Sequence, residues 1–177
     1  MILVISSYRS GSTWFCQQLA KSTGYVNLDE MFHENLAENH KHHLRKLISL
    51  NNSIVKIFPF HLSESPINNL LDLLIQLSEK IIILVRKNTY DQCKSLYIAK
   101  SCSNWHEKNI NLTITYDPKT WNRYYNFLDN EITEIKKIIN KIPNAEIVYL
   151  EDLNQAGNYH RQIFWDIEPP LIPSKWL

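Results

Sequence analysis

Four short runs of β-branched and aliphatic residues punctuate the chain, at residues 2–5, 54–58, 81–85 and 146–150. Each run has the length and composition of a buried strand. The longer segments between the runs carry apolar residues at helical spacing, so the order of elements is strand, helix, strand, helix. This order predicts an α/β fold of three layers, in which helices cover both faces of a central parallel sheet of four to five strands.

The helical segments carry their own start signals. Ser65 and Asp117 each stand before a proline, which places a capping oxygen ahead of a residue favoured at the first helical position. We therefore expect helices from Pro66 and from Pro118, the second running to about Lys141. The apolar face of the first is Leu70, Leu71, Leu74 and Leu77. That of the second is Trp121, Tyr124, Leu128, Ile132, Ile135 and Ile139.

The length of the chain favours one domain, and its charge is nearly balanced. At 177 residues it can enclose one full hydrophobic core but not two, so we expect a single domain over residues 1–177. Its 44% hydrophobic and 21% charged residues are typical of an ordinary globular protein. A formal net charge of +1 gives no general attraction to nucleic acid or to an anionic membrane, so neither is expected as a partner.

The cysteines and the first residues predict a cytoplasmic protein. Cys16, Cys93 and Cys102 are odd in number and show no C-x-x-C spacing, which fits a reducing compartment and predicts thiols in the core. The first six residues lack the basic region of a signal peptide. No later stretch approaches roughly 20 consecutive apolar residues, the length of a membrane-spanning helix.

The loop after the first predicted strand is Ser7-Tyr-Arg-Ser-Gly-Ser-Thr-Trp14. A strand that ends in small residues and opens into a helix directs backbone N–H groups at one point, where the helix dipole also favours negative charge. Gly11 permits backbone conformations that other residues avoid, and Arg9 has a guanidinium matched to phosphate oxygens. Further hydroxyl donors are Ser10, Ser12 and Thr13. The stretch therefore predicts a site for a phosphate-like anion.

The same stretch differs from the P-loop of nucleotide triphosphatases. The pattern G-x-x-x-x-G-K-[ST] requires an earlier glycine and a lysine, and both are absent here. Without the lysine, and without an obvious acidic metal ligand after a strand, magnesium-dependent phosphoryl transfer loses its usual parts. The structural alternative is an ordinary strand-to-helix turn with an N-cap serine.

A second pair of basic and hydroxyl residues follows the strand predicted at 81–85. Arg86 comes directly after this run, and Ser95 stands nine residues later. More than two helical turns separate them, so they reach one anion only if the first few residues form a turn, with Thr89 as the cap of the next helix. The alternative is a solvated basic strand end beside a surface helix.

The two motifs together resemble those of sulfotransferases. In that family a basic residue, then Ser-Gly-[Ser/Thr]-Thr and often Trp or Leu, forms the loop that holds the 5′-phosphosulfate. The matching positions here are Arg9, Ser10, Gly11, Ser12, Thr13 and Trp14. An arginine after a strand and a serine on the next helix hold the 3′-phosphate, and Arg86 and Ser95 match them. Their spacing of nine, with Gln92 before Ser95, is similar to that of the bacterial trehalose sulfotransferase branch.

This resemblance implies a P-loop-like fold and the co-substrate 3′-phosphoadenosine-5′-phosphosulfate (PAPS), with no metal. In the trehalose branch a Thr-Gly turn precedes a glutamate that serves as the base, and Glu30 matches it after Thr23-Gly24. A hydroxyl acceptor is a poor nucleophile near neutral pH, so a carboxylate or an imidazole must take its proton. Glu30 is therefore the first candidate for the base, and His33 is the second.

Lys56 and His61 complete the set of candidate residues, as groups that bind the substrate. They lie where members of the family place groups near the sulfuryl or the acceptor. Glu30 and Lys56 each have a structural alternative. Glu30 could be an acidic loop residue without a role, and Lys56 could extend its ammonium from a strand to solvent.

Other polar residues receive structural interpretations. His40, His42 and His43 lack a recognised zinc pattern and predict a solvated helix face. Residues 149–153 resemble a Tyr-Glu-Asp-Leu element of sulfotransferases, although Glu151 and Asp152 could also cap a helix. The basic, glycine-rich C-terminal element of many members is not evident, and Lys175 is the one late lysine that could substitute for it.

The sequence thus favours a sulfotransferase that moves a sulfuryl group from PAPS to a hydroxyl of a carbohydrate or another small molecule. Two other functions stay open. One is a non-catalytic module that binds the same nucleotide, and the other is a small-molecule kinase, against which the missing P-loop lysine argues. Segments 23–35 and 103–117 lack clean periodicity and are expected to be loops where the acceptor binds.

Overall fold

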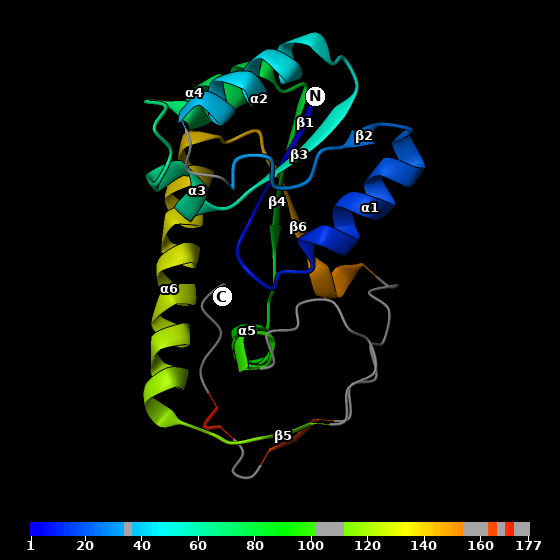
Figure 1. Cartoon of the computed structure of the whole chain (residues 1–177). Helices are drawn as coiled ribbons and strands as arrows, with labels where there is room; N and C mark the ends of the chain where they lie inside the picture. Colours follow the sequence, from blue (N-terminus) through cyan, green and yellow to red (C-terminus); the bar gives the residue numbers. More distant parts are fainter. Residues whose placement is uncertain (34–36, 102–111, 154–162, 166–168, 172–177) are drawn as a thin grey trace.

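The computed structural model describes residues 1–33, 37–101, 112–153, 163–165 and 169–171. Its elements (Figure 1) are β1 (Ile2–Ser6), α1 (Ser12–Thr23), β2 (Val26–Asn27), α2 (Ala37–Ser49), β3 (Ser53–Ile57), α3 (Pro59–Ser63), α4 (Leu70–Leu77), β4 (Lys80–Val85), α5 (Thr89–Ser101), β5 (Leu112–Ile114), α6 (Pro118–Lys141), β6 (Glu146–Tyr149), a 3₁₀ turn (Leu150–Asp152) and β7 (Ile163–Trp165). The four predicted strands are β1, β3, β4 and β6, and their ends differ from the prediction by no more than one residue.

Five strands form one parallel sheet in the order β2-β3-β1-β4-β6. Ile5 of β1 lies opposite Ile57 of β3 on one side and Ile83 of β4 on the other. Helices lie on both sides of the sheet (Figure 1). The predicted α/β class, with a central parallel sheet flanked by helices, is therefore confirmed. β2 was not predicted, because its two residues fall in segment 23–35 and are too few to show a periodicity.

A second parallel sheet pairs β5 with β7. β5 lies near the end of segment 103–117, which was expected to be a loop, and residues 103–111 lie outside the described part of the chain. Leu112 pairs with Ile163, a partner far away in the sequence. Because each strand has only three residues, the local pattern could not indicate this pairing.

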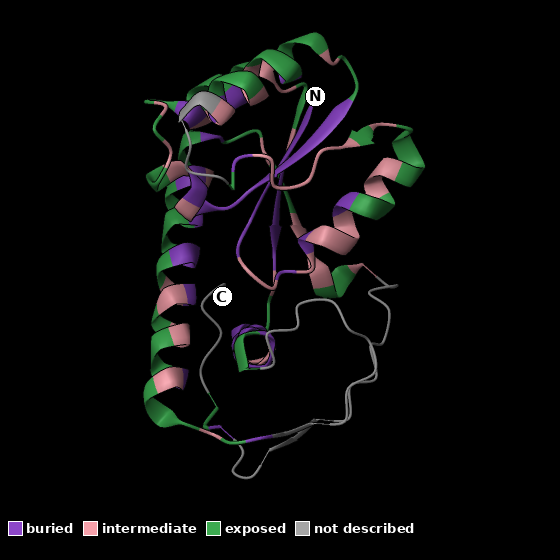
Figure 2. Ribbon diagram, viewed as in Figure 1, coloured by how far each residue is buried: buried purple, intermediate pink, exposed green. Residues whose placement is uncertain are grey.

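The alternation of side chains along the strands produces two apolar cores, one on each face of the sheet. Successive side chains of a strand point to opposite faces. On β1, Leu3 and Ile5 pack with apolar residues of α2, α4 and α6, whereas Ile2 and Val4 pack with residues of α1. The central strands β1 and β3 and most of β4 are buried on both faces (Figure 2), which explains why they are continuous apolar runs in the sequence.

The two described cysteines are core thiols, as predicted. Cys16 of α1 packs against the sheet, and Cys93 of α5 packs against α6. Burial raises the pKa of each thiol to about 12, so both stay protonated and unreactive near neutral pH. Cys102 lies outside the described residues.

α6 begins and ends where the sequence predicted. The carboxylate of Asp117 accepts hydrogen bonds from the N–H groups of Lys119 (3.3 Å) and Thr120 (2.9 Å). The helix then runs for 24 residues to Lys141. None of the helices in the described segments, α6 included, is long and apolar enough to cross a membrane.

The predicted helix start at Pro66 is wrong, because α4 begins at Leu70. Asn69, the N-cap, has a φ of 60°, in the left-handed region that ends regular structure before it. The hydroxyl of Ser65 accepts from the N–H of Ile67 at 3.1 Å in a local turn instead of capping a helix.

The strand order places a topological switch point beside β1. The chain leaves β1 toward β2 and β3 on one side, and it later forms β4 and β6 on the other. In open α/β sheets, ligands bind at such a point, outside the carboxyl ends of the strands. The loop of residues 7–11 after β1 and the loop of residues 86–88 after β4 both begin there. The fold therefore places both sequence motifs where a ligand is expected.

Gly11 and Gly24, at the two ends of α1, provide a matched pair of substitutions. Both have a positive φ, 80° and 74°. A Cβ on Gly11 would lie 2.7 Å from a methyl carbon of Leu150, whereas one on Gly24 would meet nothing within 4 Å. We expect Gly24→Ala to lower the free energy of unfolding by about 1 kcal/mol through backbone strain, and Gly11→Ala to lower it by roughly 1 kcal/mol more, because Leu150 must move. Urea denaturation measures both, and equal losses would contradict the packing role of Gly11.

Candidate functional site

The loop after β1 enters α1 through two residues in the left-handed region. Arg9 and Gly11 have φ values of 60° and 80°, and Gly11 is the N-cap of α1 with no side-chain capping bond. The alternative in which a serine caps this helix is therefore wrong. The N–H of Phe15 donates to the carbonyl of Gly11 at 3.0 Å. The N–H groups of residues 12–14 precede it and have no acceptor within the helix, so they can bind an anion.

Side chains of α5 hold this loop in place. Arg9 Nε donates to Ser95 Oγ at 2.9 Å. Gln92 Nε2 donates to Ser7 Oγ at 2.7 Å and to the carbonyl oxygen of Tyr8 at 2.5 Å. Arg86, directly after β4, reaches the carbonyl oxygen of Arg9 with Nη1 at 3.4 Å. The structure therefore brings Arg9, Arg86 and Ser95 together, across 86 residues of sequence between the first and the last.

Two buried polar atoms at this point, Ser10 Oγ and Arg86 Nε, have no hydrogen-bond partner in the described part of the chain. Arg86 Nε lies 3.7 Å from Glu151 Oε1, an ion pair longer than a hydrogen bond. Burial lowers the pKa of the Arg86 guanidinium, and Asp91 and Glu151 oppose this effect. Because buried polar atoms are normally paired, an anionic acceptor next to these two donors would satisfy them.

Acidic residues after β6 hold the start of α5. Glu151 accepts from the backbone N–H groups of Lys87 (2.9 Å) and Asn88 (3.2 Å). Asp152 pairs with Lys87 Nζ at 2.6 Å. Asn88 caps α5 through its own side chain, which accepts from the N–H three residues later at 3.0 Å, so the predicted cap at Thr89 is wrong. Glu151 and Asp152 thus stabilise the turn of residues 86–88, which directs Arg86 toward α5.

Lys56 on β3 is a fully buried ammonium with three oxygen partners. Its Nζ lies 2.6 Å from Asp29 Oδ1, 2.8 Å from Glu30 Oε1 and 2.9 Å from Thr13 Oγ1. Its side chain has no exposed surface. The interpretation in which Lys56 extends to solvent is therefore wrong. A buried charge needs such partners, because desolvation without them is costly.

The chain after β2 follows β3 and thereby carries the two carboxylates to Lys56. The N–H of Leu28 donates to the carbonyl of Ile54 at 2.9 Å, and the N–H of Lys56 donates to the carbonyl of Asp29 at 3.0 Å. Asp29 then turns the chain with a φ of 49°. Glu30 follows directly, so backbone pairing with β3 fixes where both side chains lie. Glu30 is consequently an ion-pair partner of Lys56, not a loop residue without a role.

Glu30 also belongs to a cluster with His33 and His61. One polar atom of each side chain lies within 4.8 Å of the others. His61 is buried, and its Nδ1 accepts from the N–H of Phe58 at 3.2 Å. Burial, with smaller effects of His33 and Lys56, lowers the pKa of His61 to about 3, so the ring is neutral with its proton on Nε2. This Nε2–H is buried and has no acceptor among the described residues.

The same hydrogen bond disfavours a metal ion at this cluster. Three residues of these types at this separation are a common ligand set. A histidine ligand, however, must offer a nitrogen lone pair. The Nδ1 lone pair of His61 already accepts from Phe58, and Nε2 carries the proton. The cluster is therefore better suited to donating a hydrogen bond and accepting a proton than to holding a cation.

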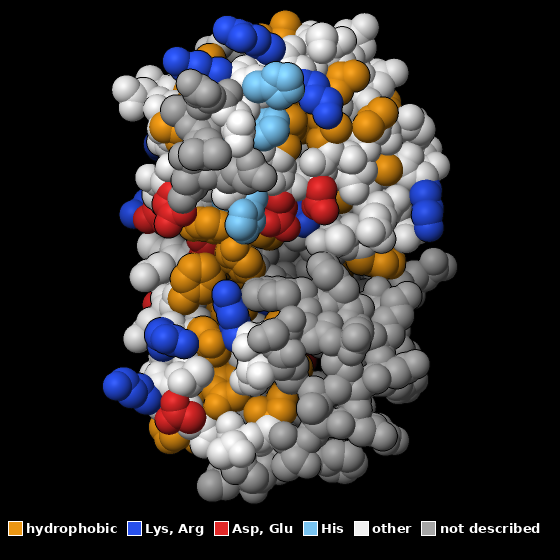
Figure 3. All heavy atoms as spheres, viewed as in Figure 1, with side chains coloured by type: hydrophobic (Ala, Val, Ile, Leu, Met, Phe, Trp, Pro, Cys, Tyr) orange, Lys and Arg blue, Asp and Glu red, His pale blue; other side chains and the backbone are white. Residues whose placement is uncertain are grey.

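An aromatic wall lies next to this polar cluster. The Tyr8 ring packs against Phe58, Phe60 and Phe127, with centroids 4.6, 5.4 and 5.5 Å away. The His33 ring is 6.2 Å from Phe60 in an edge-on arrangement. On the face shown in Figure 3, histidine and acidic side chains gather directly above an apolar surface. A molecule with one polar and one apolar face could contact both.

The three histidines of α2 are only partly on a solvated face. His42 is exposed, but His40 is fully buried, which the sequence did not predict. Its Nδ1 lies 3.2 Å from Ser65 Oγ, and its ring packs edge-on against Phe32 at 5.4 Å. His40 is therefore part of the contact between α2 and the residues before α4.

Sequence reasoning missed several residues of the site. Asp29 shares Lys56 with Glu30, and its position beside a predicted base was the available signal. Tyr8 lies in the loop after β1, and nothing in the local sequence shows that its ring meets Phe58. Gln92 was noted for its position only. Lys175 and most of segment 103–117 lie outside the described residues.

No model of a known protein family matches the chain, and no curated protein sequence matches it significantly. The interpretation of the site therefore depends on its geometry. The loop after β1, with Arg9, Arg86 and Ser95, lies at the switch point, and the cluster of Glu30, His33 and His61 lies beside it. Lys56 and Thr13 connect the two at 2.9 Å.

The Lys56 ion pairs predict non-additive effects of substitution. Glu30→Gln and Asp29→Asn should each lower the free energy of unfolding by about 1 kcal/mol, because the other carboxylate still faces Lys56. The double substitution should cost roughly 3 kcal/mol or more, because it leaves a buried ammonium without a counter-charge. A double-mutant cycle in urea measures this coupling, and strictly additive losses would contradict it.

His61 should stay neutral over the whole physiological range. The unfolded chain takes up a proton near the ordinary pKa of 6.5, whereas the folded ring does so near 3. The stability that depends on the neutral ring is therefore present above pH 6.5 and is lost as the pH falls toward 3. An NMR titration should show the Nε2–H tautomer throughout this range, and His61→Gln should flatten the acid limb of the stability curve. A ring that titrates near its ordinary pKa would contradict the assignment.

Proposed function

We propose that this chain is a sulfotransferase that moves a sulfuryl group from PAPS to a hydroxyl of a carbohydrate or another small-molecule acceptor. One contact carries the proposal: Arg9 Nε donates to Ser95 Oγ at 2.9 Å. The resemblance assigns Arg9 to the 5′-phosphosulfate and Ser95 to the 3′-phosphate. The 5′-phosphosulfate and the 3′-phosphate are attached to the same ribose, so the residues that bind them must lie side by side. The contact between Arg9 and Ser95 meets this requirement.

The loop after β1 would bind the 5′ end of the nucleotide. The N–H groups at the start of α1 and the side chains of Ser10, Ser12 and Thr13 supply donors, and Arg9 supplies charge. Donors fixed in advance stabilise the charge that develops on the sulfuryl and on the departing phosphate. The position of this loop, between the first strand and the first helix of a parallel sheet, is also why we propose a P-loop-like fold.

Arg86 would hold the 3′-phosphate together with Ser95. Its Nε is buried without a hydrogen-bond partner among the described residues, and its guanidinium lies at the carboxyl end of β4. An arginine binds phosphate through two N–H groups at once, which fixes orientation as well as charge. Glu151 and Asp152 would act indirectly, because they hold the turn between Arg86 and α5.

Glu30 would act as the base. The acceptor oxygen attacks sulfur while Glu30 takes its proton, and the bond from sulfur to the 5′-phosphate oxygen breaks, with its electrons leaving on 3′-phosphoadenosine-5′-phosphate. Lys56 Nζ lies 2.8 Å from Glu30 and 2.9 Å from Thr13, between the base and the loop. A positive charge there stabilises the transferring sulfuryl group.

The two histidines would serve different purposes. His61 offers a fixed Nε2–H that can donate to an acceptor or sulfuryl oxygen, and its low pKa prevents it from acting as a base. His33 is exposed and stands as the second candidate for the base. The aromatic wall of Tyr8 and Phe60 next to them suits the apolar face of a sugar ring.

Nucleotide selectivity tests the proposed co-substrate. We expect 3′-phosphoadenosine-5′-phosphate to raise the melting temperature more than ATP does, since a ligand that binds only the folded state stabilises it. Arg86→Gln should weaken its binding roughly 10- to 100-fold. Lys80→Gln, at the other end of the same strand, is the matched control and should bind as the wild type does. Tighter binding of ATP would favour a kinase and contradict the proposal.

Transfer of labelled sulfate from PAPS to a panel of sugars and phenols tests the reaction. Glu30→Gln should lower turnover by about 10² to 10⁴-fold while nucleotide binding is kept. Arg9→Ala should lower both. Near-wild-type turnover in either variant would remove that residue from its role, and binding without transfer to any acceptor would favour a non-catalytic module.

A further inference from the structure

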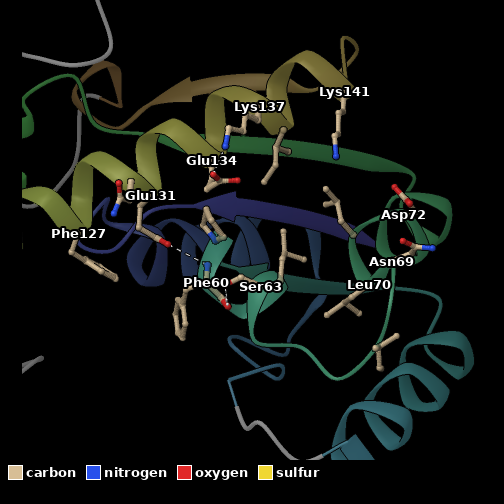
Figure 4. Close-up of a pocket in the computed structure, with 16 residues that line it drawn as sticks. Phe60, Ser63, Asn69, Leu70, Asp72, Phe127, Glu131, Glu134, Lys137 and Lys141 are labelled. Atoms are coloured by element: carbon tan, nitrogen blue, oxygen red, sulfur yellow. Dashed lines mark hydrogen bonds and ion pairs between the residues drawn. The ribbon is translucent and has the colours of Figure 1, made fainter.

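A pocket of about 560 Å³ lies between α3, α4 and α6. Figure 4 shows that its lining side chains come from one face of α6 and from the facing ends of α3 and α4. None of the polar residues of the candidate site lines this pocket, although Phe60 and Phe127 of the aromatic wall do. α3 separates the pocket from those polar residues: Phe60 faces the pocket, while the next residue, His61, belongs to the cluster with Glu30.

Glu131 is a buried carboxyl in the wall of this pocket. Only 4% of the residue is exposed. Its Oε1 accepts a hydrogen bond from the N–H of Phe60 at 3.2 Å, whereas its Oε2 is buried without a partner among the described residues. Leaving half of a buried carboxyl unpaired is unfavourable, so this oxygen points to a ligand that would pair with it.

The protonation of Glu131 indicates which group would pair with it. Burial, with a smaller effect of Glu134, raises the pKa of Glu131 to about 8, although the bond from Phe60 opposes this. Near neutral pH the carboxyl therefore carries a proton, and because Oε1 accepts from Phe60, the proton belongs on Oε2. A hydroxyl group both donates and accepts, so it satisfies Oε2 in either protonation state.

The rest of the pocket has apolar surface along its length, and both Asp72 and Lys141 line its far end (Figure 4). Phe127, Leu70 and Ile138 contribute apolar surface. Lys141 also lines the pocket and extends from α6 toward α4 (Figure 4). It stands ten residues after Glu131 on the same helix, or roughly 15 Å along the axis. The other lysine of the rim, Lys137, is already paired with an adjacent glutamate at 2.6 Å.

We propose that this pocket binds an elongated amphipathic molecule, with a hydroxyl at Glu131, a hydrocarbon body against the apolar wall and an anionic group at Lys141. A pocket of this size is in the range that holds small molecules. The polar groups at its two ends fix the orientation of such a ligand, and the distance between them sets its length. Binding here does not involve Arg9, Glu30 or Arg86, so the proposal stands independently of sulfuryl transfer.

Calorimetric titration of the full chain with ω-hydroxydecanoate, below its micellar concentration, tests the proposal. We expect one saturable site. Decanoate, which lacks the hydroxyl, and decanediol, which lacks the carboxylate, should each bind about tenfold more weakly. The absence of saturable binding, or equal affinity for all three probes, would overturn the proposal.

Single substitutions test the contribution of each end of the pocket. Glu131→Leu should weaken ω-hydroxydecanoate about tenfold, and Glu131→Gln, which keeps polar atoms at the same place, should bind it nearly as the wild type does. Lys141→Gln should weaken ω-hydroxydecanoate but leave decanediol unchanged. The exposed Asn130 also lines the pocket, so Asn130→Trp should block binding without altering Glu131. If Glu131→Leu does not fold by circular dichroism, Asn130→Trp decides, and wild-type affinity in it would overturn the proposal.

Discussion

The buried ammonium of Lys56 is the interaction on which the arrangement of the site depends. It has no exposed surface and lies within 2.9 Å of oxygens from Thr13, Asp29 and Glu30. A charge at this depth is tolerated only with such compensation. The start of α1 and the chain after β2 must therefore meet at β3, and three segments that are separate in the sequence are fixed around one atom.

Lys56 connects two parts of the candidate site. On one side, α5 holds the loop after β1 through Gln92 and Ser95, and leaves buried donors at Ser10 and Arg86. On the other, Glu30 lies beside the neutral ring of His61. Lys56 lies between them, so an anion on the loop and a hydroxyl at Glu30 would meet across its charge. An arrangement of this kind suits the transfer of an anionic group to a hydroxyl, which is the basis of the proposed function.

The sequence predicted the features that depend on residues close to one another in the chain. The central strands β1, β3 and β4 are continuous apolar runs because both of their faces are buried, and Asp117 caps α6 as its place before a proline indicated. Contacts between residues distant in the sequence could not be predicted from local patterns. The two-residue β2, the burial of His40 and the second carboxylate on Lys56 all depend on partners distant in sequence. Glu131 interrupts an apolar face of α6, and only the structure shows that Phe60 lies opposite it.

A crystal structure of the chain with 3′-phosphoadenosine-5′-phosphate would test the proposed binding site. We expect the 5′-phosphate to lie against the N–H groups at the start of α1, with Arg9 beside it, and the 3′-phosphate to lie between Arg86 and Ser95. We also expect open space next to Glu30 for an acceptor hydroxyl. A nucleotide bound elsewhere, or one whose phosphates do not contact these residues, would rule out the proposed site.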